Sequence, residues 1–256
     1  MKIFTSKDDR QTIDRKKNLY ITISTIGLVL IWHLSALALA KPYILPTPVE
    51  SMEAFIHLVF SRSFHLALFY TLLRVLSVVA VSTFLGIVFG ILSGRFTVLE
   101  HLLSPLVLLI KTVPTIVLIV YVVLWMSGYL APIFVTILIT FPVVYGNVLE
   151  GYKRIDEKLI ELADVYKFNW IKKLRTVLFP SIKPYIQSSV LAIGGLGLKV
   201  VIASEVLSQT QNSLGRSFQI ARMNIDTSEV LALAMVTIII SVVLDELSKH
   251  LLKKMN

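Results

Sequence analysis

The sequence contains no cysteine among its 256 residues, and only 16% of them are charged. Without cysteine the chain can form neither a disulfide framework nor a thiolate-bound zinc or iron–sulfur site. Soluble domains carry about 25% charged residues, so this chain has too few to cover an ordinary water-exposed surface. Because 55% of the residues are hydrophobic and the mean hydropathy is +0.78, a disordered chain is also excluded.

Signatures of catalysis and of nucleotide binding are missing as well. The phosphate-binding pattern G-x-x-x-x-G-K-[ST] does not occur, and neither do H-E-x-x-H and G-x-S-x-G. The segment Gly195–Lys199 is no substitute for the first pattern, because its spacing differs and it lies in an apolar run. The five histidines are scattered without the spacing of metal ligands. We therefore predict a chain that is not an enzyme and that holds no cofactor and no metal.

The chain does have six long apolar runs, and a bilayer core takes about 20 apolar residues per helix. The runs are Leu19–Ala40, Leu72–Ser93, Leu102–Met126, Leu130–Leu149, Ile182–Leu207 and Val230–Leu247. They predict an all-α polytopic membrane protein with six transmembrane helices. Residues 1–18 and 250–256 are predicted tails, and residues 65–249 the core. The first run is longer than the apolar part of a cleaved signal peptide, about 7–15 residues, so we expect it to stay as a helix.

The net charge of +9 is distributed as the topology of a membrane protein requires. With the N-terminus in the cytoplasm, eighteen lysines and arginines fall in the inner segments and only four in the outer segments. The outer four are Lys41, Arg62, Arg216 and Arg222. Since basic residues accumulate on the cytoplasmic side, we predict a multi-pass protein of the cell membrane with both termini in the cytoplasm. This placement also argues against nucleic acid as the partner.

The longest inner segment, residues 151–181, is charged but patterned. Apolar side chains recur at helical spacing in both of its halves: Ile155, Leu159, Leu162, Ala163 and Tyr166, then Trp170, Leu174, Val177 and Leu178. Asn169 suits the N-cap of the second half, and Pro180 is expected to end it. We predict two short amphipathic helices joined near Lys167–Asn169. Periodicity alone leaves open whether they bind a partner or lie on lipid.

Within this segment, three stretches resemble the "EAA" loop of bacterial ABC importer permeases. They are Glu161-Leu162-Ala163, Lys167-Phe168-Asn169 and Leu178-Phe179-Pro180. In that family Glu-Ala-Ala is followed by a glycine, which permits a sharp turn, and further on by Leu-Pro. Lys167 stands where the glycine is expected. Asn169 tolerates left-handed backbone geometry and is expected to take over part of the glycine's role.

The resemblance continues along most of residues 65–249. The stretches similar to other spans of the family are Thr71–Val75 with Gly86, Gly90 and Gly94, then Lys111–Pro114, Phe141-Pro142 and Ala203–Val206. The last of these and Leu45–Pro48 resemble the corresponding stretches in one branch of the family. The permeases of that branch serve nitrate, sulfonates, taurine and bicarbonate.

The resemblance implies the transmembrane permease subunit of an ABC importer. It implies two cytoplasmic ATPase subunits that bind the ATP, an extracytoplasmic solute-binding protein, and a second permease chain, expected to be identical. The implied solute is a sulfonate, a nitrate-like anion or a thiamin precursor. The residues implied to contact the ATPase are Glu161, Leu162, Ala163, Tyr166, Lys167, Asn169 and Trp170. The binding protein is expected to dock on residues 41–66 and 208–228.

Ser82, Gly86, Gly90 and Gly94 repeat at four-residue spacing, which places small side chains on one face of a helix. In lipid such a face allows two helix backbones to approach closely. We expect this face to pack within the chain, the alternative being an interface between two permease chains.

Four ionisable residues fall within the predicted spans: Arg74, Lys111, Lys199 and Glu205. A charge at mid-bilayer costs about 2.5–3.5 kcal/mol, so it faces a cavity or a partner unless its side chain reaches an interface. Arg74 and Lys111 are expected to reach an interface. We assign Lys111, Pro114, Lys199 and Glu205 to the translocation path or its gate. The alternative for Glu205 is a structural ion pair with Arg74 or Lys199.

Three other classes of membrane protein are weighed against the importer. A secondary transporter needs an inverted repeat and carboxylates at mid-membrane, and Glu205 alone is thin support. The membrane component of a vitamin importer has paired Ala-Arg-Gly signatures, which Ala221–Met223 matches only in part. A membrane enzyme needs a catalytic constellation, which the sequence does not show. The alternative to an ABC permease is thus a secondary transporter, or another transport component that no ATPase drives.

Overall fold

The structure is a computed structural model that describes residues 7–126 and 128–254. Within these residues all regular structure is helical, which confirms the predicted all-α fold. Residues 1–6 and 255–256, the outer ends of the two predicted tails, lie outside the described residues. The described parts of both tails are helical, because the first and last helices continue into them.

Five helices contain a stretch long and apolar enough to cross a bilayer. They are α1 (Lys7–Leu39), α3 (Arg62–Arg95), α6 (Leu130–Lys153), α9 (Phe179–Ser208) and α11 (Thr227–Lys254). A sixth crossing is formed by α4 (Thr97–Thr112) together with α5 (Thr115–Trp125), if this bent pair counts as one span. α3 begins ten residues before the predicted second span, because Ser61 caps it: the side chain of Ser61 accepts a hydrogen bond from the Phe64 amide.

The third predicted span, Leu102–Met126, is not one continuous helix. α4 and α5 meet at an angle of 103°. Pro114 lies between them and has no N–H to continue the helix. Val113 has the extended backbone (φ −69°, ψ 131°) that a residue before proline prefers. The proline therefore breaks the span that apolarity alone predicted.

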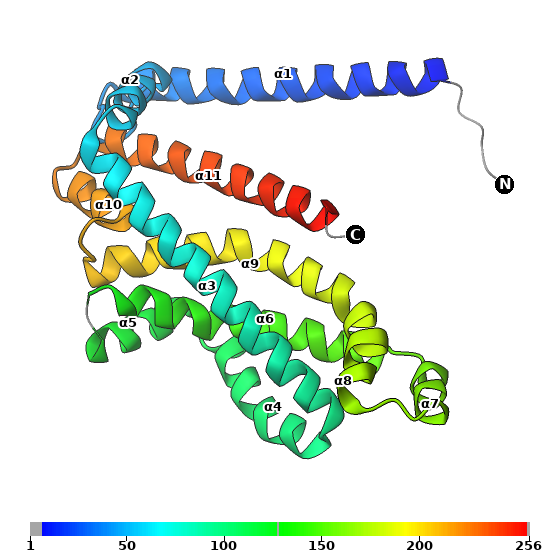
Figure 1. The fold of residues 1–256 in the computed structure, drawn as a ribbon. Coiled ribbons are helices and arrows are strands. Elements are labelled where there is room, and N and C mark those ends of the chain that lie inside the picture. Colours follow the sequence, from blue (N-terminus) through cyan, green and yellow to red (C-terminus); the bar gives the residue numbers. More distant parts are fainter. Residues whose placement is uncertain (1–6, 127, 255–256) are drawn as a thin grey trace.

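The long helix α3 packs against α6 and α9 and forms the centre of the bundle with them (Figure 1). Its small residues make the approach to α6 possible. A Cβ atom on Gly86 would lie 2.5 Å from the Cβ of Val144, and one on Gly90 would lie 2.7 Å from the Cγ1 of Val148. Gly94 lies just as close to the ring of Tyr152. This face therefore packs within the chain.

Short helices lie at the two ends of the bundle. α2 (Pro48–Val59) and α10 (Leu214–Met223) lie at one end, and α7 (Glu157–Val165) and α8 (Trp170–Lys173) lie at the other (Figure 1). The first and last described residues are on the side of α7 and α8. α1 runs apart from the bundle and approaches it only near α2, so that just 6% of its apolar stretch is buried within the chain.

Candidate functional site

Asp156 is the N-cap of α7, and its side chain accepts a hydrogen bond from the Lys158 amide at 3.0 Å. Beyond this cap the helix has one buried and one exposed apolar face. Ala163 is turned inward and is only 3% exposed. Leu162 and Tyr166, by contrast, are 52% and 68% exposed. The segment thus leaves apolar side chains uncovered at the end of the bundle.

α7 ends in a cap that is built on Lys167, which has left-handed backbone geometry (φ +52°). The Phe168 amide donates to the Ala163 carbonyl at 2.9 Å, and the Lys167 amide donates to the Asp164 carbonyl at 2.8 Å. These two bonds form a Schellman motif, in which glycine is the usual residue at the left-handed position. Lys167 itself makes the turn. The expectation that Asn169 would share the left-handed role is wrong, since its φ is −67°.

Asn169 caps α8 as predicted, because its Oδ1 accepts a hydrogen bond from the Lys172 amide at 2.9 Å. The prediction that Pro180 ends this helix is wrong. α8 continues through a π-helical turn, Leu174–Leu178, directly into α9. Pro180 lies in the first turn of α9, and the wider π turn before it makes room for its ring. The segment after α7 is therefore continuous with a membrane-spanning helix.

Two side-chain contacts hold this segment in place. The Arg95 guanidinium, at the end of α3, lies over the ring of Trp170, with 3.8 Å from Cζ to the ring centroid. The Lys173 ammonium forms an ion pair with Asp164, which joins α8 to α7. Of the seven residues implied to contact an ATPase, Ala163 is buried and Trp170 is half-buried. The exposed five are Glu161, Leu162, Tyr166, Lys167 and Asn169.

A second polar cluster lies near the opposite end of the bundle, around Glu205. The Glu205 carboxylate is completely buried and accepts a hydrogen bond from Nη1 of Arg74 at 2.8 Å. It also accepts from the hydroxyl of Thr71 at 3.0 Å and from the amide of Gly215 at 3.1 Å. Arg74 is 1% exposed, so the expectation that it reaches an interface is wrong. For Glu205 the structural alternative holds in this structure, because the residue pairs with Arg74.

Gly215 explains how α10 reaches this carboxylate. A Cβ atom on Gly215 would lie 2.6 Å from the Val206 nitrogen and 2.7 Å from the Ile202 oxygen, both of which are backbone atoms of α9. Only glycine fits such an approach. The N-terminus of α10, where unpaired amides favour negative charge, therefore sits directly on the Glu205 carboxylate.

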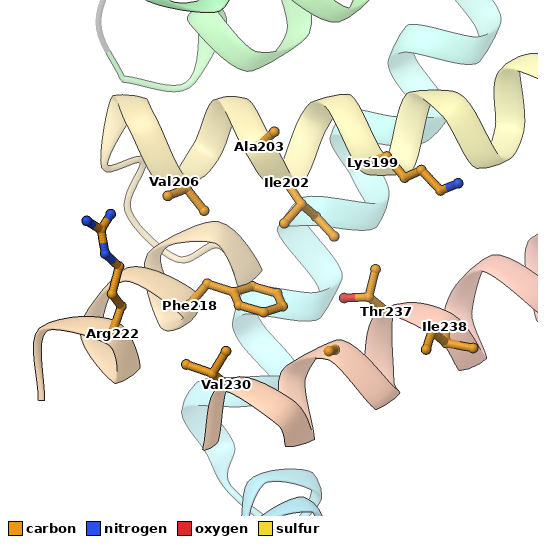
Figure 2. Close-up of a pocket in the computed structure, with 10 residues that line it drawn as sticks. Lys199, Ile202, Ala203, Val206, Phe218, Arg222, Val230, Thr237 and Ile238 are labelled. Carbon is orange, nitrogen blue, oxygen red and sulfur yellow. The ribbon is translucent and has the colours of Figure 1, made fainter. Parts of the chain in front are cut away.

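The other three candidates for the translocation path, Lys111, Pro114 and Lys199, are all exposed on the single chain. They lie on α4, in the break before α5, and on α9, respectively. Within the described part of the chain, no hydrogen bond or ion pair joins any two of the four candidates. Lys199 lines a cavity between α9, α10 and α11 (Figure 2).

Sequence reasoning did not find α2 and α10. A signal for α2 was present in Thr47 and Glu50, which have the spacing of a capping box. The Glu50 amide donates to the Thr47 hydroxyl at 3.2 Å, and the Thr47 amide donates to the Glu50 carboxylate at 2.7 Å. α10 has a simpler cap, in which the side chain of Ser213 accepts a hydrogen bond from the Arg216 amide at 3.0 Å. Both helices are too short to appear in a search for membrane spans.

These features define a polytopic helical membrane protein with short helices at both ends of its bundle. Comparison with known families specifies the type. Residues 86–256 match the family described as "Binding-protein-dependent transport system inner membrane component". The match covers more than half of the chain, and the chain therefore belongs to this family.

Two relatives are permeases by name, and one solved structure shares the fold. A putative aliphatic sulfonates transport permease protein, SsuC of Bacillus subtilis, is 26% identical over 231 residues, covering 89% of this chain and 83% of the relative. The taurine transport system permease protein TauC of Escherichia coli is 27% identical over 245 residues, covering 92% and 88%. A chain of the inward-facing MetNI methionine ABC transporter shares the fold, with a TM-score of 0.63 at 16% identity over 77% of this chain and 100% of that chain.

The chain is thus a permease subunit of an ABC importer, an inner-membrane component and not itself an enzyme. Membership of this family implies ATPase partners and a permease partner within the importer. The prediction of an ABC permease, in preference to a secondary transporter, is confirmed.

Proposed function

We propose that this chain forms the path for a small organic anion of the sulfonate class and is coupled to its ATPase through the exposed face of α7. Two relatives named for aliphatic sulfonates and for taurine support the solute class. The observation that carries the coupling role is the uncovered apolar stripe of Leu162, Val165 and Tyr166, exposed by 52%, 76% and 68%. Such a stripe at the end of a bundle marks a site of interaction.

The charges on α7 favour a protein partner over a lipid surface. Helices that lie on membranes carry lysine and arginine on their polar face, which attract anionic lipids. α7 has the acidic residues Glu157, Glu161 and Asp164 and only one basic residue, Lys158. The net negative charge of α7 itself disfavours an anionic headgroup surface and suits a groove on a soluble subunit, whereas most basic residues of the segment 151–181 lie after α7, in residues 166–175.

Replacing Leu162 tests the coupling surface. We expect Leu162→Asp to reduce the ATPase that co-purifies with a tagged permease by about tenfold or more, as loss of a buried apolar anchor does. The matched variant Leu162→Met keeps the apolar contact and should retain the ATPase. Permease content in the membrane is measured in both, since the exposed side chain is not needed for folding. Wild-type recovery of ATPase with Leu162→Asp contradicts the docking assignment.

We further propose that α7 and both termini face the cytoplasm, and that residues 41–66 and 208–228 receive a solute-binding protein outside. The excess of basic residues in the inner segments supports this orientation. Both of these segments lie at the end of the bundle opposite α7 (Figure 1). Because the chain has no cysteine, single variants Lys41→Cys and Lys158→Cys report the orientation. A membrane-impermeant maleimide should label position 41 in intact cells and position 158 only after lysis.

The permease partner is proposed to be an identical chain. Co-expression of two copies with different tags tests this, because a homodimer brings both tags down together. Recovery of only one tag, together with a different permease chain, would replace the homodimer by a heterodimer.

A further inference from the structure

A cavity of about 200 Å³ lies between α4 and α6. α4 contributes Glu100, Ser104, Leu108 and Lys111 to its wall, and α6 contributes Tyr145. The α4 residues follow one another at intervals of four, four and three positions, so they lie on one face of the helix. Most of these side chains carry a polar group, and polar groups between membrane helices mark sites with a partner or a function. The cavity is therefore a candidate site for a polar molecule.

Lys111 extends its charged end toward α6. A Cβ atom on Gly146 would lie 3.5 Å from Nζ of Lys111, so the ammonium lies against the backbone of α6. Gly146 comes seven residues before Lys153, the last residue of α6, which is about 10 Å along the helix axis. α6 has 24 residues and a length of about 36 Å, enough to cross a hydrocarbon core of about 30 Å. The ammonium is thus held at membrane depth.

Lys111 has no counter-ion, since it forms no ion pair within the described residues. α4 and α6 carry one acidic residue each, and both of these pair with other cations. Glu100 is eleven positions from Lys111, about 16 Å along α4, and is bonded to Lys153 at 2.6 Å. Glu150, near the end of α6, is bonded to Arg154 at 2.7 Å. An occupant that complements the cavity therefore carries negative charge.

Two further features favour water and a polar solute in this cavity over lipid chains. Tyr145 is 3% exposed, and its buried hydroxyl has no hydrogen-bond partner within the described residues. Buried polar groups are nearly always hydrogen-bonded, so this wall lacks an acceptor. α4 also ends one residue after Lys111, at the break before α5. Breaks of this kind at membrane depth line protein or a water-filled cavity.

We propose that Lys111 binds the anionic group of the transported solute, a small sulfonate, in the cavity between α4 and α6. This rests on the proposed function, because it identifies a solute-binding step within the path. Sites that enclose a whole ligand measure roughly 300–1,000 Å³, which is more than this cavity offers. It holds the anionic group and leaves the rest of the solute in the open path. The site therefore selects by charge and tolerates different organic groups.

Because the chain has no cysteine, a single thiol can report the charge at this site. Leu108 lies one turn before Lys111, lines the cavity and is 63% exposed. The variant Leu108→Cys is placed in nanodiscs with the co-purified ATPase, so that both membrane faces are open to reagents. Two methanethiosulfonate reagents of opposite charge are compared, one with a 2-sulfonatoethyl group and one with a 2-(trimethylammonium)ethyl group. Mass spectrometry of the permease measures the two labelling rates.

We expect Lys111→Met to lower the ratio of the two rates, anionic reagent over cationic reagent, by about tenfold. A unit charge about 6 Å away favours one reagent and disfavours the other by about threefold each, even in water. Lys111→Arg keeps the charge and should keep the ratio. Lys249→Met is the matched control, because Lys249 lies near the end of α11 and is bonded to Glu246 at 2.7 Å. Its loss should leave the ratio unchanged.

Protection from labelling tests whether the site binds the solute. Propane-1-sulfonate at millimolar concentration should slow the labelling of Leu108→Cys by the neutral reagent methyl methanethiosulfonate. The same sulfonate should not protect the thiol when Lys111→Met is also present. Propyltrimethylammonium, which has the same chain length and the opposite charge, should protect neither variant.

An unchanged rate ratio in Lys111→Met overturns the proposal, and so does protection that is absent or independent of Lys111. A thiol at position 108 that neither charged reagent labels also overturns it, because lipid or a second chain then covers the cavity. If any of these results is obtained while the ATPase remains attached, this inference fails and the proposed function stands. If no ATPase co-purifies, the proposed function fails as well.

Discussion

The guanidinium of Arg95 stacks on the ring of Trp170, with 3.8 Å from Cζ to the ring centroid. Arg95 is the last residue of α3, and Trp170 is the first residue of α8. The contact therefore joins the central helix of the bundle to the segment that we propose the ATPase moves. A cation–π contact contributes about 0.5–2 kcal/mol, which is enough to shift a population but not to hold the fold together.

We expect Arg95→Ala to lower solute-stimulated ATP hydrolysis by about threefold to tenfold while the ATPase stays bound, because a loss of about 0.5–2 kcal/mol of coupling is of that order. Hydrolysis by the reconstituted importer, measured with and without solute, checks this. Arg154→Ala is the matched control, since the ion pair of Arg154 with Glu150 is exposed to solvent and does not join α3 to α8. Equal loss in both variants would show a general effect of charge.

The left-handed turn at Lys167 predicts a substitution that stabilises the protein. A residue with a Cβ costs about 1–2 kcal/mol in this conformation, and glycine does not. We expect Lys167→Gly to raise the thermal midpoint of the purified permease and Lys167→Val to lower it. Both variants remove the charge, so charge cannot account for a difference between them. A shared direction of change would rule out backbone strain as the cause.

We predict that the buried pair of Arg74 and Glu205 stabilises the fold, because each side chain neutralises the buried charge of the other. Removing one partner leaves an uncompensated buried charge, which costs about 3–5 kcal/mol. We expect Arg74→Leu and Glu205→Leu each to reduce the thermal midpoint strongly, and the double variant to lose less than the sum. Glu205→Gln, with transport and expression both unchanged, would leave the carboxylate without a role.

The packing of α3 on α6 predicts a sharp contrast between two glycines. Gly90→Leu forces a side chain into Val148, and overpacking of this kind typically costs about 1–3 kcal/mol. Gly27→Leu is the control, because nothing lies within 4 Å of a Cβ at Gly27. The yield and thermal midpoint of the purified permease should fall for the first variant only. Tolerance of Gly90→Leu would contradict the close contact.

Local signals in the sequence accounted for much of this structure. Apolar runs located the crossings, the residue type and position of Asn169 indicated its cap, and the spacing of Gly86 and Gly90 indicated a contact face. Each signal acts over a few residues, so a sequence can display it directly. The ends of α3 and α9 were harder to predict, because these helices continue beyond the apolar part that lipid requires.

Contacts between distant residues were harder to predict. Arg74 and Glu205 are separated by 131 positions, and no periodicity reports that two such residues meet. The same limit explains Ala163, whose inward orientation depends on how α7 docks rather than on its own pattern. The break at Pro114 was missed as well, because apolarity alone predicted one continuous span over residues 102–126.

That break has a consequence for the assembled importer. Pro114 has no N–H to donate to the carbonyl of Ile110, and the last carbonyls of α4 have no following turn to serve them. Hydrocarbon offers such groups no hydrogen bond, so irregular backbone at membrane depth is always shielded by protein or wetted. Where α4 and α5 together form one crossing, the surface around Lys111 and Pro114, bare on the single chain, is therefore closed to acyl chains, and water or a neighbouring subunit occupies it.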